Sequence, residues 1–158
     1  NNIRHQFKNS ECGVYSMHFI IRLLEGMTFE DVTKNIVKDD DNPELIFLAS
    51  GSEVNLALEV SKLMNDRRVR VVSMPCWELF DVQPKEYRDS IIPSRGAMKI
   101  SFEAGITLGW ERYIGPNGLS IGLDRFGASA PGKDLAEEFG FTPQKVSEKI
   151  ISHLKKLL

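Results

Sequence analysis

The stretch that decides the fold is LIFLASGSE, residues 45–53. Its first five residues are all apolar, which is typical of a short strand buried on both faces of a sheet. Ser50 and Glu53 then have the S-x-x-E spacing of a capping box, so a helix is predicted to begin there and to run to about Asp66. A buried strand followed directly by a helix indicates an α/β unit.

The same alternation continues toward the C-terminus. Three further apolar and β-branched runs, at residues 69–74, 97–102 and 119–123, predict three more strands. Thr142 and Pro143 suit the N-cap and first position of a last helix. One face of that helix is apolar, through Val146, Ile150, Leu154 and Leu157. Strands separated by helices predict an α/β fold with a mostly parallel sheet and helices on both faces.

The chain divides at an acidic run. Residues 39–41 are three aspartates, and Asn42 and Pro43 follow them. Successive carboxylates repel one another and stay solvated, and a proline moves the residue before it out of the helical region. We therefore expect a helical segment over residues 1–42, which is too short to build a core alone, and a domain over residues 43–158.

Composition excludes several function classes. Among 158 residues, 20 Lys and Arg face 22 Asp and Glu, so the net charge of -2 offers no basic field for a nucleic acid. No apolar run approaches the roughly 20 residues that a membrane helix needs. Cys12 and Cys76 are the two cysteines, without a CxxC motif, and they indicate reduced thiols of a cytoplasmic protein. Cys76 is interpreted as a small buried hydrophobe.

Several segments resemble the C-terminal domain of transketolase. They are LASGSEVNLALEVSKL, VRVVSMPCWELFDVQPKEYRDSIIP, EAGITLGWERYIG, GLDRFGASAP and FGFTPQKV, and they follow one another in order between residues 43 and 158. In that family the domain is a five-stranded, mostly parallel α/β unit. The resemblance therefore implies one short or edge strand beyond the four predicted above.

The resemblance also implies a function. Transketolase moves a two-carbon ketol unit between sugar phosphates with thiamine diphosphate and a divalent metal such as Mg²⁺, which its first two domains hold. The present sequence contains neither of those domains. The resemblance implies a non-catalytic domain for support and association that binds no cofactor by itself. Its expected partners are a second copy or other transketolase-type domains, with no nucleic acid and no membrane.

Two pairs of residues are candidates for binding. Gly51 and Ser52 lie in a strand-to-helix turn whose free N–H groups could hold an anion, although a structural helix start is the favoured interpretation. Asp124 and Arg125 could form an interdomain or subunit contact, or a local ion pair that fixes a glycine-containing loop. The residues alone leave these two alternatives equal.

Other conspicuous side chains have structural interpretations. Glu103 at a strand end is interpreted as a hydrogen-bonding residue rather than an acid or base. Trp77 and Trp110 are interpreted as core residues rather than partner-facing anchors. If partner domains normally cover part of this domain, however, Trp110, Phe126 and the glycine-rich loops around them are the candidate apolar surface.

The first 42 residues suggest a different chemistry. Cys12 precedes a helical apolar pattern, and a thiolate at a helix start is stabilised by the free N–H groups. The pattern from Gln6 to Glu11-Cys12-Gly13 resembles the nucleophile segment of Ulp1- and adenain-type cysteine peptidases, whose substrates are SUMO-like or viral. That resemblance implies Cys12 as nucleophile and Gln6 in the oxyanion hole. The alternative function is therefore a fragment of such a peptidase, incomplete because no histidine occupies the family's position.

Overall fold

The computed structural model describes residues 36–38 and 42–157. Gln6, Cys12 and most of the segment predicted for residues 1–42 lie outside these residues. The domain expected from residue 43 onward is described almost completely.

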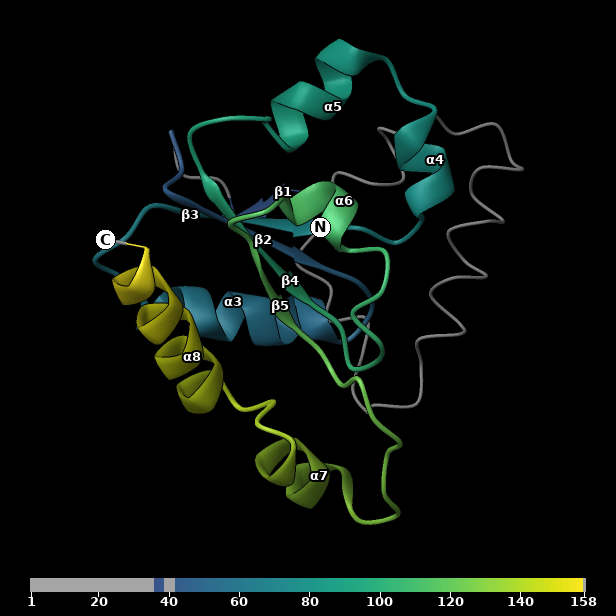
Figure 1. Cartoon of the computed structure of the whole chain (residues 1–158), viewed down its shortest axis with the longest axis vertical. Coiled ribbons are helices and arrows are strands. Elements are labelled where there is room, and N and C mark those ends of the chain that lie inside the picture. Colours follow the sequence, from purple (N-terminus) through teal and green to yellow (C-terminus); the bar gives the residue numbers. More distant parts are fainter. Residues whose placement is uncertain (1–35, 39–41, 158) are drawn as a thin grey trace.

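A five-stranded sheet forms the centre of the molecule (Figure 1). Its strand order is β1-β3-β2-β4-β5. Four strands are parallel, namely β2 (Leu45–Ala49), β3 (Val69–Ser73), β4 (Met98–Phe102) and β5 (Leu119–Ile121). The prediction of a mostly parallel α/β sheet is confirmed.

The fifth strand is β1 (Ile36–Lys38), which pairs antiparallel with β3 at the edge of the sheet. It lies on the N-terminal side of Pro43, so the sheet includes residues from before the expected division of the chain. The residue pattern does not reveal this strand, because three residues beside an acidic run carry too little alternation to indicate one.

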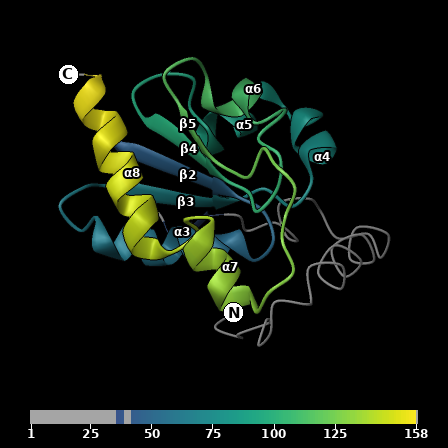
Figure 2. The same cartoon turned by 60° about the horizontal axis from the view of Figure 1, so that its bottom comes forward.

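Helices cover both faces of the sheet (Figures 1 and 2). The helices are α3 (Glu53–Leu63), α4 (Trp77–Asp81), α5 (Lys85–Ile91), α6 (Glu111–Ile114), α7 (Gly132–Glu138) and α8 (Pro143–Lys156). The chain passes from β2 outward to β3 through α3 and then returns to β4 on the other side of β2 through α4 and α5. Because parallel crossovers are right-handed, this reversal of direction places α3 and α4–α5 on opposite faces.

Each face has its own apolar core, since successive side chains of a strand point to opposite faces. Leu45, Phe47 and Ala49 of β2 belong to the cluster that includes residues of α3 and α8. Ile46 and Leu48 belong to the other cluster, with residues from α4, α5 and α6. The prediction that β2 is buried on both faces is confirmed.

The start of α3 differs from the predicted capping box. Its N-cap is Ser52, which has helical dihedral angles and makes no side-chain cap hydrogen bond. The Ser50 hydroxyl instead donates to Glu103 Oε2 at 2.8 Å. In a capping box this hydroxyl would accept a hydrogen bond from the backbone N–H of Glu53, whereas here it donates a charge-assisted bond to a carboxylate at a neighbouring strand end. The helix also ends at Leu63, short of Asp66.

The last helix begins as predicted, with Thr142 as an extended N-cap and Pro143 in the first turn. Val146 and Ile150 are buried in the core beside α3, and Leu154 packs against the same cluster. Leu157 at the end of the predicted stripe is exposed instead, because it lies just beyond the helix.

Two adjacent isoleucines of α8 provide a matched test of this packing. Ile150→Ala should lower the free energy of unfolding by about 2–5 kcal/mol, because Ile150 is fully buried and its loss leaves a cavity. Ile151→Ala makes the same chemical change at a side chain that is 42% exposed, and it should cost well under about 1 kcal/mol. Urea denaturation of the full chain measures both, and equal losses would mean that α8 does not pack through Ile150.

Candidate functional site

The strand order creates a reversal point between β2 and β4. In open α/β sheets, ligands bind outside the carboxyl ends of the strands at such a point. The residues that follow β2 and β4 are Ser50 and Glu103, and their side chains meet there in the 2.8 Å hydrogen bond. Glu103 thus has the hydrogen-bonding role that the sequence favoured.

A second carboxylate stands at the same place. Glu53, the first residue of α3, accepts a hydrogen bond of 2.7 Å from the Ser52 hydroxyl. Burial raises the pKa of Glu53, and the nearby charge of Glu103 raises this pKa further, while hydrogen bonds from Ser52 and from backbone N–H groups oppose the rise.

The turn of Gly51 and Ser52 therefore already faces two carboxylates. Gly51 has a φ of +52°, which its missing Cβ permits at the sharp turn from β2 into α3. An added anion would meet the charges of Glu53 and Glu103, so this geometry favours the structural interpretation of the turn. The anion-binding role of Gly51 and Ser52 stays a prediction.

The loops that follow β4 and β5 are clamped together. The Asp124 carboxylate accepts hydrogen bonds from the backbone N–H of Thr107 at 2.7 Å and from its hydroxyl at 2.8 and 3.0 Å. These bonds hold the pKa of Asp124 below its ordinary value. Leu123 N–H also donates to the Gly105 carbonyl at 2.7 Å. We call residues 103–110 and 122–131 the clamped loop pair.

One glycine makes the close approach of these loops possible. A Cβ on Gly122 would lie 2.3 Å from Thr107 Cγ2, a distance that no relaxed side chain could occupy. The clamp and this contact together hold the loops in fixed relative positions.

Asp124 and Arg125 take different partners. Asp124 bonds Thr107, whereas the Arg125 guanidinium lies over the Phe139 ring at 5.3 Å from its centroid. Within the described part of the chain no ion pair joins the two residues, so the alternative of a local Asp–Arg pair is not what the structure contains. Both side chains are largely exposed, which leaves them available for the contact alternative.

Three large apolar side chains project from the clamped loop pair. Ile106 is 63% exposed, Leu108 72% and Phe126 95%. We call these three residues the loop apolar patch. The sequence identified Phe126 and the glycine-containing loops, but it did not single out Ile106 or Leu108, whose placement between Gly105 and Gly109 was the available signal.

Trp110 does not belong to this surface. It is 1% exposed and contacts Trp77 edge-on, with ring centroids 4.8 Å apart. The core interpretation of Trp110 is therefore confirmed, and its candidacy as exposed surface was wrong. The Trp110 indole is buried because it packs against the rings of Trp77 and Tyr113 in an aromatic cluster on that face of the sheet.

Cys76 also differs from its interpretation. It is only partly buried, and its thiol lies 3.4 Å from Glu78 Oε2. Partial desolvation raises the pKa of this thiol, and the Glu78 carboxylate raises the pKa further. Cys76 is partly exposed because it lies at the N-cap of α4 and not in the core.

The side chains at this edge do not fit a magnesium-bound cofactor. Among residues 36–38 and 42–157, no group of three or more His, Cys, Asp or Glu side chains could hold a metal ion. Mg²⁺ needs several oxygen ligands in octahedral geometry. The same residues contain no helix that is both long and apolar enough to cross a membrane.

Comparison with known proteins identifies the family. The profile described as "Transketolase-like TK C-terminal domain" matches residues 34–142. The chain belongs to the transketolase C-terminal domain family. This match begins just before β1, so that strand is included in the transketolase-type unit.

Individual transketolases agree with this assignment. Transketolase 7 of Craterostigma plantagineum is 42% identical over 132 residues, which cover 78% of this chain and 20% of the relative. A transketolase of Staphylococcus aureus (strain MW2) is 39% identical over 138 residues, covering 84% of this chain and 21% of the relative. The chain thus spans about a fifth of the length of the curated relatives it matches.

Solved structures give the same result. Transketolase from Leishmania mexicana superposes with a TM-score of 0.72 and 41% identity, over 83% of this chain and 19% of that chain. A structure named "Split gene transketolase, inactive beta4 tetramer" shares the fold at a TM-score of 0.54 and 17% identity, over 73% of this chain and 40% of that chain. These similarities do not support the cysteine-peptidase alternative.

The carboxylate pair at the reversal point predicts a pH-dependent stability. Glu53→Gln should raise the free energy of unfolding at neutral pH, because the folded protein holds the Glu53 charge partly buried and beside Glu103. Because folding raises the pKa of Glu53, protonation of this carboxyl group stabilises the folded state at pH values below its pKa in the unfolded chain, which is ordinarily 4.5. That stabilisation is lost as the pH rises through the pKa of Glu53 in the folded protein. The gain from glutamine should therefore shrink as the pH falls through the raised folded pKa of Glu53 toward 4.5, and it should be smallest below that value.

Urea titrations at neutral pH and at about pH 3.5 measure this difference. Glu59→Gln, which removes an exposed carboxylate from the same helix, controls for the change in net charge. An equal gain from Glu53→Gln at both pH values would contradict the prediction.

Proposed function

We propose that this chain is the non-catalytic support and association domain of a transketolase-like enzyme. In that enzyme, other domains would hold thiamine diphosphate and Mg²⁺ and would transfer the two-carbon ketol unit. Family membership supports the proposal, as does the donor set of the described residues, which does not fit a metal-bound diphosphate. The domain boundary between residues 42 and 43 stays a prediction. The cytoplasmic localisation, and the absence of nucleic-acid and membrane partners, also stay predictions.

The loop apolar patch is the observation that carries the association role. Fully burying one large apolar side chain contributes roughly 1.5–3 kcal/mol, and Ile106, Leu108 and Phe126 are each mostly exposed on the clamped loop pair. The Thr107–Asp124 clamp holds their loops in place before any partner arrives. A surface that is already ordered loses little conformational entropy on docking, so its apolar area converts more fully into affinity.

The occupants that fit this patch are a second copy of the chain or other transketolase-type domains. Both would bring apolar surface to residues that the domain leaves uncovered. Asp124 and Arg125 lie in the same clamped loop pair, with Arg125 held over Phe139, and they could supply polar contacts at its rim.

Self-association should depend on the loop apolar patch. The sedimentation coefficient of the chain should rise with protein concentration, because the patch buries itself against a partner copy. Ile106→Ser with Phe126→Ser should weaken association about tenfold or more, since two large apolar contacts are lost.

The matched control is Val82→Ser, which changes a 75% exposed apolar residue after α4, outside the patch. Analytical ultracentrifugation compares the three proteins. A wild-type chain that stays monomeric throughout, or a double variant that associates like wild type, would exclude self-association through this patch.

The chain alone should not bind the family's cofactor. Calorimetric titration with thiamine diphosphate and magnesium chloride should give no saturable heat, because the described residues offer no set of oxygen ligands for the metal. A complete transketolase such as that of Staphylococcus aureus serves as the positive control in the same buffer. Saturable binding by this chain in the micromolar range would overturn the support role.

A further inference from the structure

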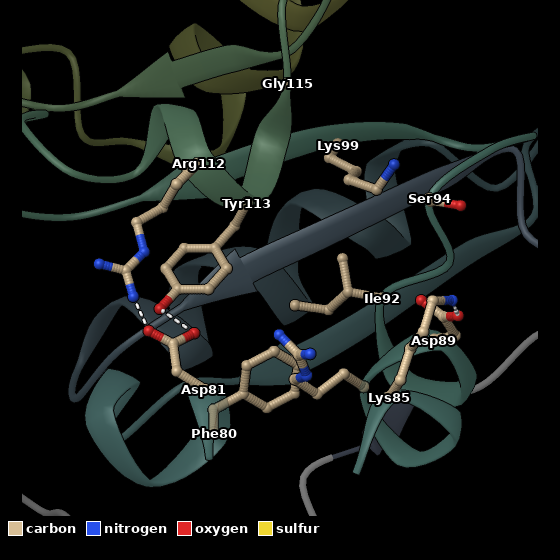
Figure 3. A pocket seen from close by; sticks show the side chains of 11 residues that line it. Phe80, Asp81, Lys85, Asp89, Ile92, Ser94, Lys99, Arg112, Tyr113 and Gly115 are labelled. Atoms are coloured by element: carbon tan, nitrogen blue, oxygen red, sulfur yellow. Dashed lines mark hydrogen bonds and ion pairs between the residues drawn. The ribbon is translucent and has the colours of Figure 1, made fainter. Parts of the chain in front are cut away.

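A charged pocket lies on the face of the sheet that α4, α5 and α6 cover (Figure 3). Its volume is about 630 Å³, and its walls come from these three helices, from β4 and from the segment after α5. It shares no residue with the loop apolar patch. Four cationic residues and two acidic ones line it, namely Lys85, Arg88, Lys99, Arg112, Asp81 and Asp89.

Both acidic residues of the pocket already have cationic partners. Arg112 forms an ion pair with Asp81, and the Tyr113 hydroxyl donates to the same carboxylate at 3.0 Å (Figure 3). Lys85 forms an ion pair with Asp89, one turn further along α5. These pairs neutralise two of the four cations.

Within the described ranges, the other two cations have no such partner. Lys99 is only 8% exposed, and among the described residues its ammonium group makes one hydrogen bond, of 3.5 Å to the carbonyl oxygen of Ala97. Arg88 carries a buried Nε–H that finds no hydrogen-bond acceptor in the part of the chain that the structure describes. Among the described residues, no carboxylate forms an ion pair with either side chain.

The position of Lys99 on β4 makes this arrangement unusual. Ile100 and Phe102 belong to the core beside α3 and α8, so Lys99 points to the opposite face, into the pocket. A residue in the middle of a buried strand is normally apolar, and a buried lysine normally has an anionic partner. Burial also lowers the pKa of Lys99, the expected response of an ammonium group that lacks a counter-charge.

We propose that this pocket binds the phosphate group of a small molecule between Lys99 and Arg88. Two unneutralised cations match the charge of a phosphate dianion. Its tetrahedral oxygens can accept hydrogen bonds from donors on separate elements, here the Lys99 ammonium on β4 and the Arg88 Nε–H on α5. Ser94 lines the same pocket and offers a hydroxyl donor.

The remaining walls suit the organic part of a phosphate monoester. Phe80, Ile92 and Tyr113 line the pocket, and they present apolar and aromatic surface beside the charged groups. The Arg112 guanidinium lies over the Tyr113 ring at 4.9 Å from its centroid, which fixes that wall. Free inorganic phosphate and the phosphate of a monoester would use the same cations.

Titration of the full 158-residue chain tests the site. The probes are inorganic phosphate and glycerol phosphate at constant ionic strength, with sodium acetate as the monoanion control, and amide chemical shifts report binding. Both phosphates should produce saturable shifts around α5 and β4, and acetate should not. Tighter binding of glycerol phosphate would assign the site to monoesters, and equal binding would assign it to the phosphate group alone.

Substitutions identify the groups that hold the phosphate. Lys99→Met and Arg88→Gln should each weaken phosphate binding about tenfold or more, because each removes a charge-assisted hydrogen bond. Lys62→Met removes one exposed charge from α3 on the opposite face, and it should change the affinity by less than about twofold. Thermal unfolding checks that each variant is folded, and Lys99→Met should not destabilise the chain, since it removes an unpaired buried charge.

A measurement on the unmodified chain supplies a second readout. Phosphate should protect Lys99, but not Lys62, from acetylation by acetic anhydride, as followed by mass spectrometry of the digested protein. The proposal is overturned if phosphate gives no saturable shifts, if Lys99→Met binds phosphate like wild type, or if Lys62→Met loses as much affinity as Lys99→Met.

Discussion

Strand β2 lies between β3 and β4, and its backbone hydrogen bonds to both neighbours hold the sheet together. All five of its side chains are buried, with Leu45, Phe47 and Ala49 on one face and Ile46 and Leu48 on the other. Each helix layer therefore packs against the same strand. Burial of this apolar strand on both sides is the constraint from which the two-core architecture follows.

The reversal of chain direction at β2 also determines where polar side chains lie close together. Because the chain leaves β2 toward β3 and later returns beside it as β4, the residues after both strands emerge at one edge. There Ser50 bonds Glu103, and Glu53 stands beside them with a raised pKa. That edge is acidic, whereas the pocket on the face of α4–α6 retains two unneutralised cations. The domain thus separates opposite charges onto different surfaces.

The fold was accessible from the sequence to a large extent. The apolar run at residues 45–49 and the later runs each became parallel strands, and Thr142-Pro143 opened the last helix. The edge strand β1 was not found, because three residues carry too little pattern. The capping box failed at Ser50 because its hydroxyl bonds Glu103, which lies 53 positions away in the chain.

Sequence by itself therefore determined the α/β class, the central strand and the family resemblance, since these depend on local apolar pattern and on segments that stay contiguous. Only the tertiary structure decided which polar groups meet. Asp124 bonds Thr107 rather than Arg125, and Trp110 is core rather than surface, because partners from separate loops and strands compete with neighbours in the chain. Lys99 looks like an interruption in a strand until the fold places it, with Arg88, in a pocket whose acids are already paired. Long-range proximity has no local signature, because it depends on how β4, α5 and α6 are packed together.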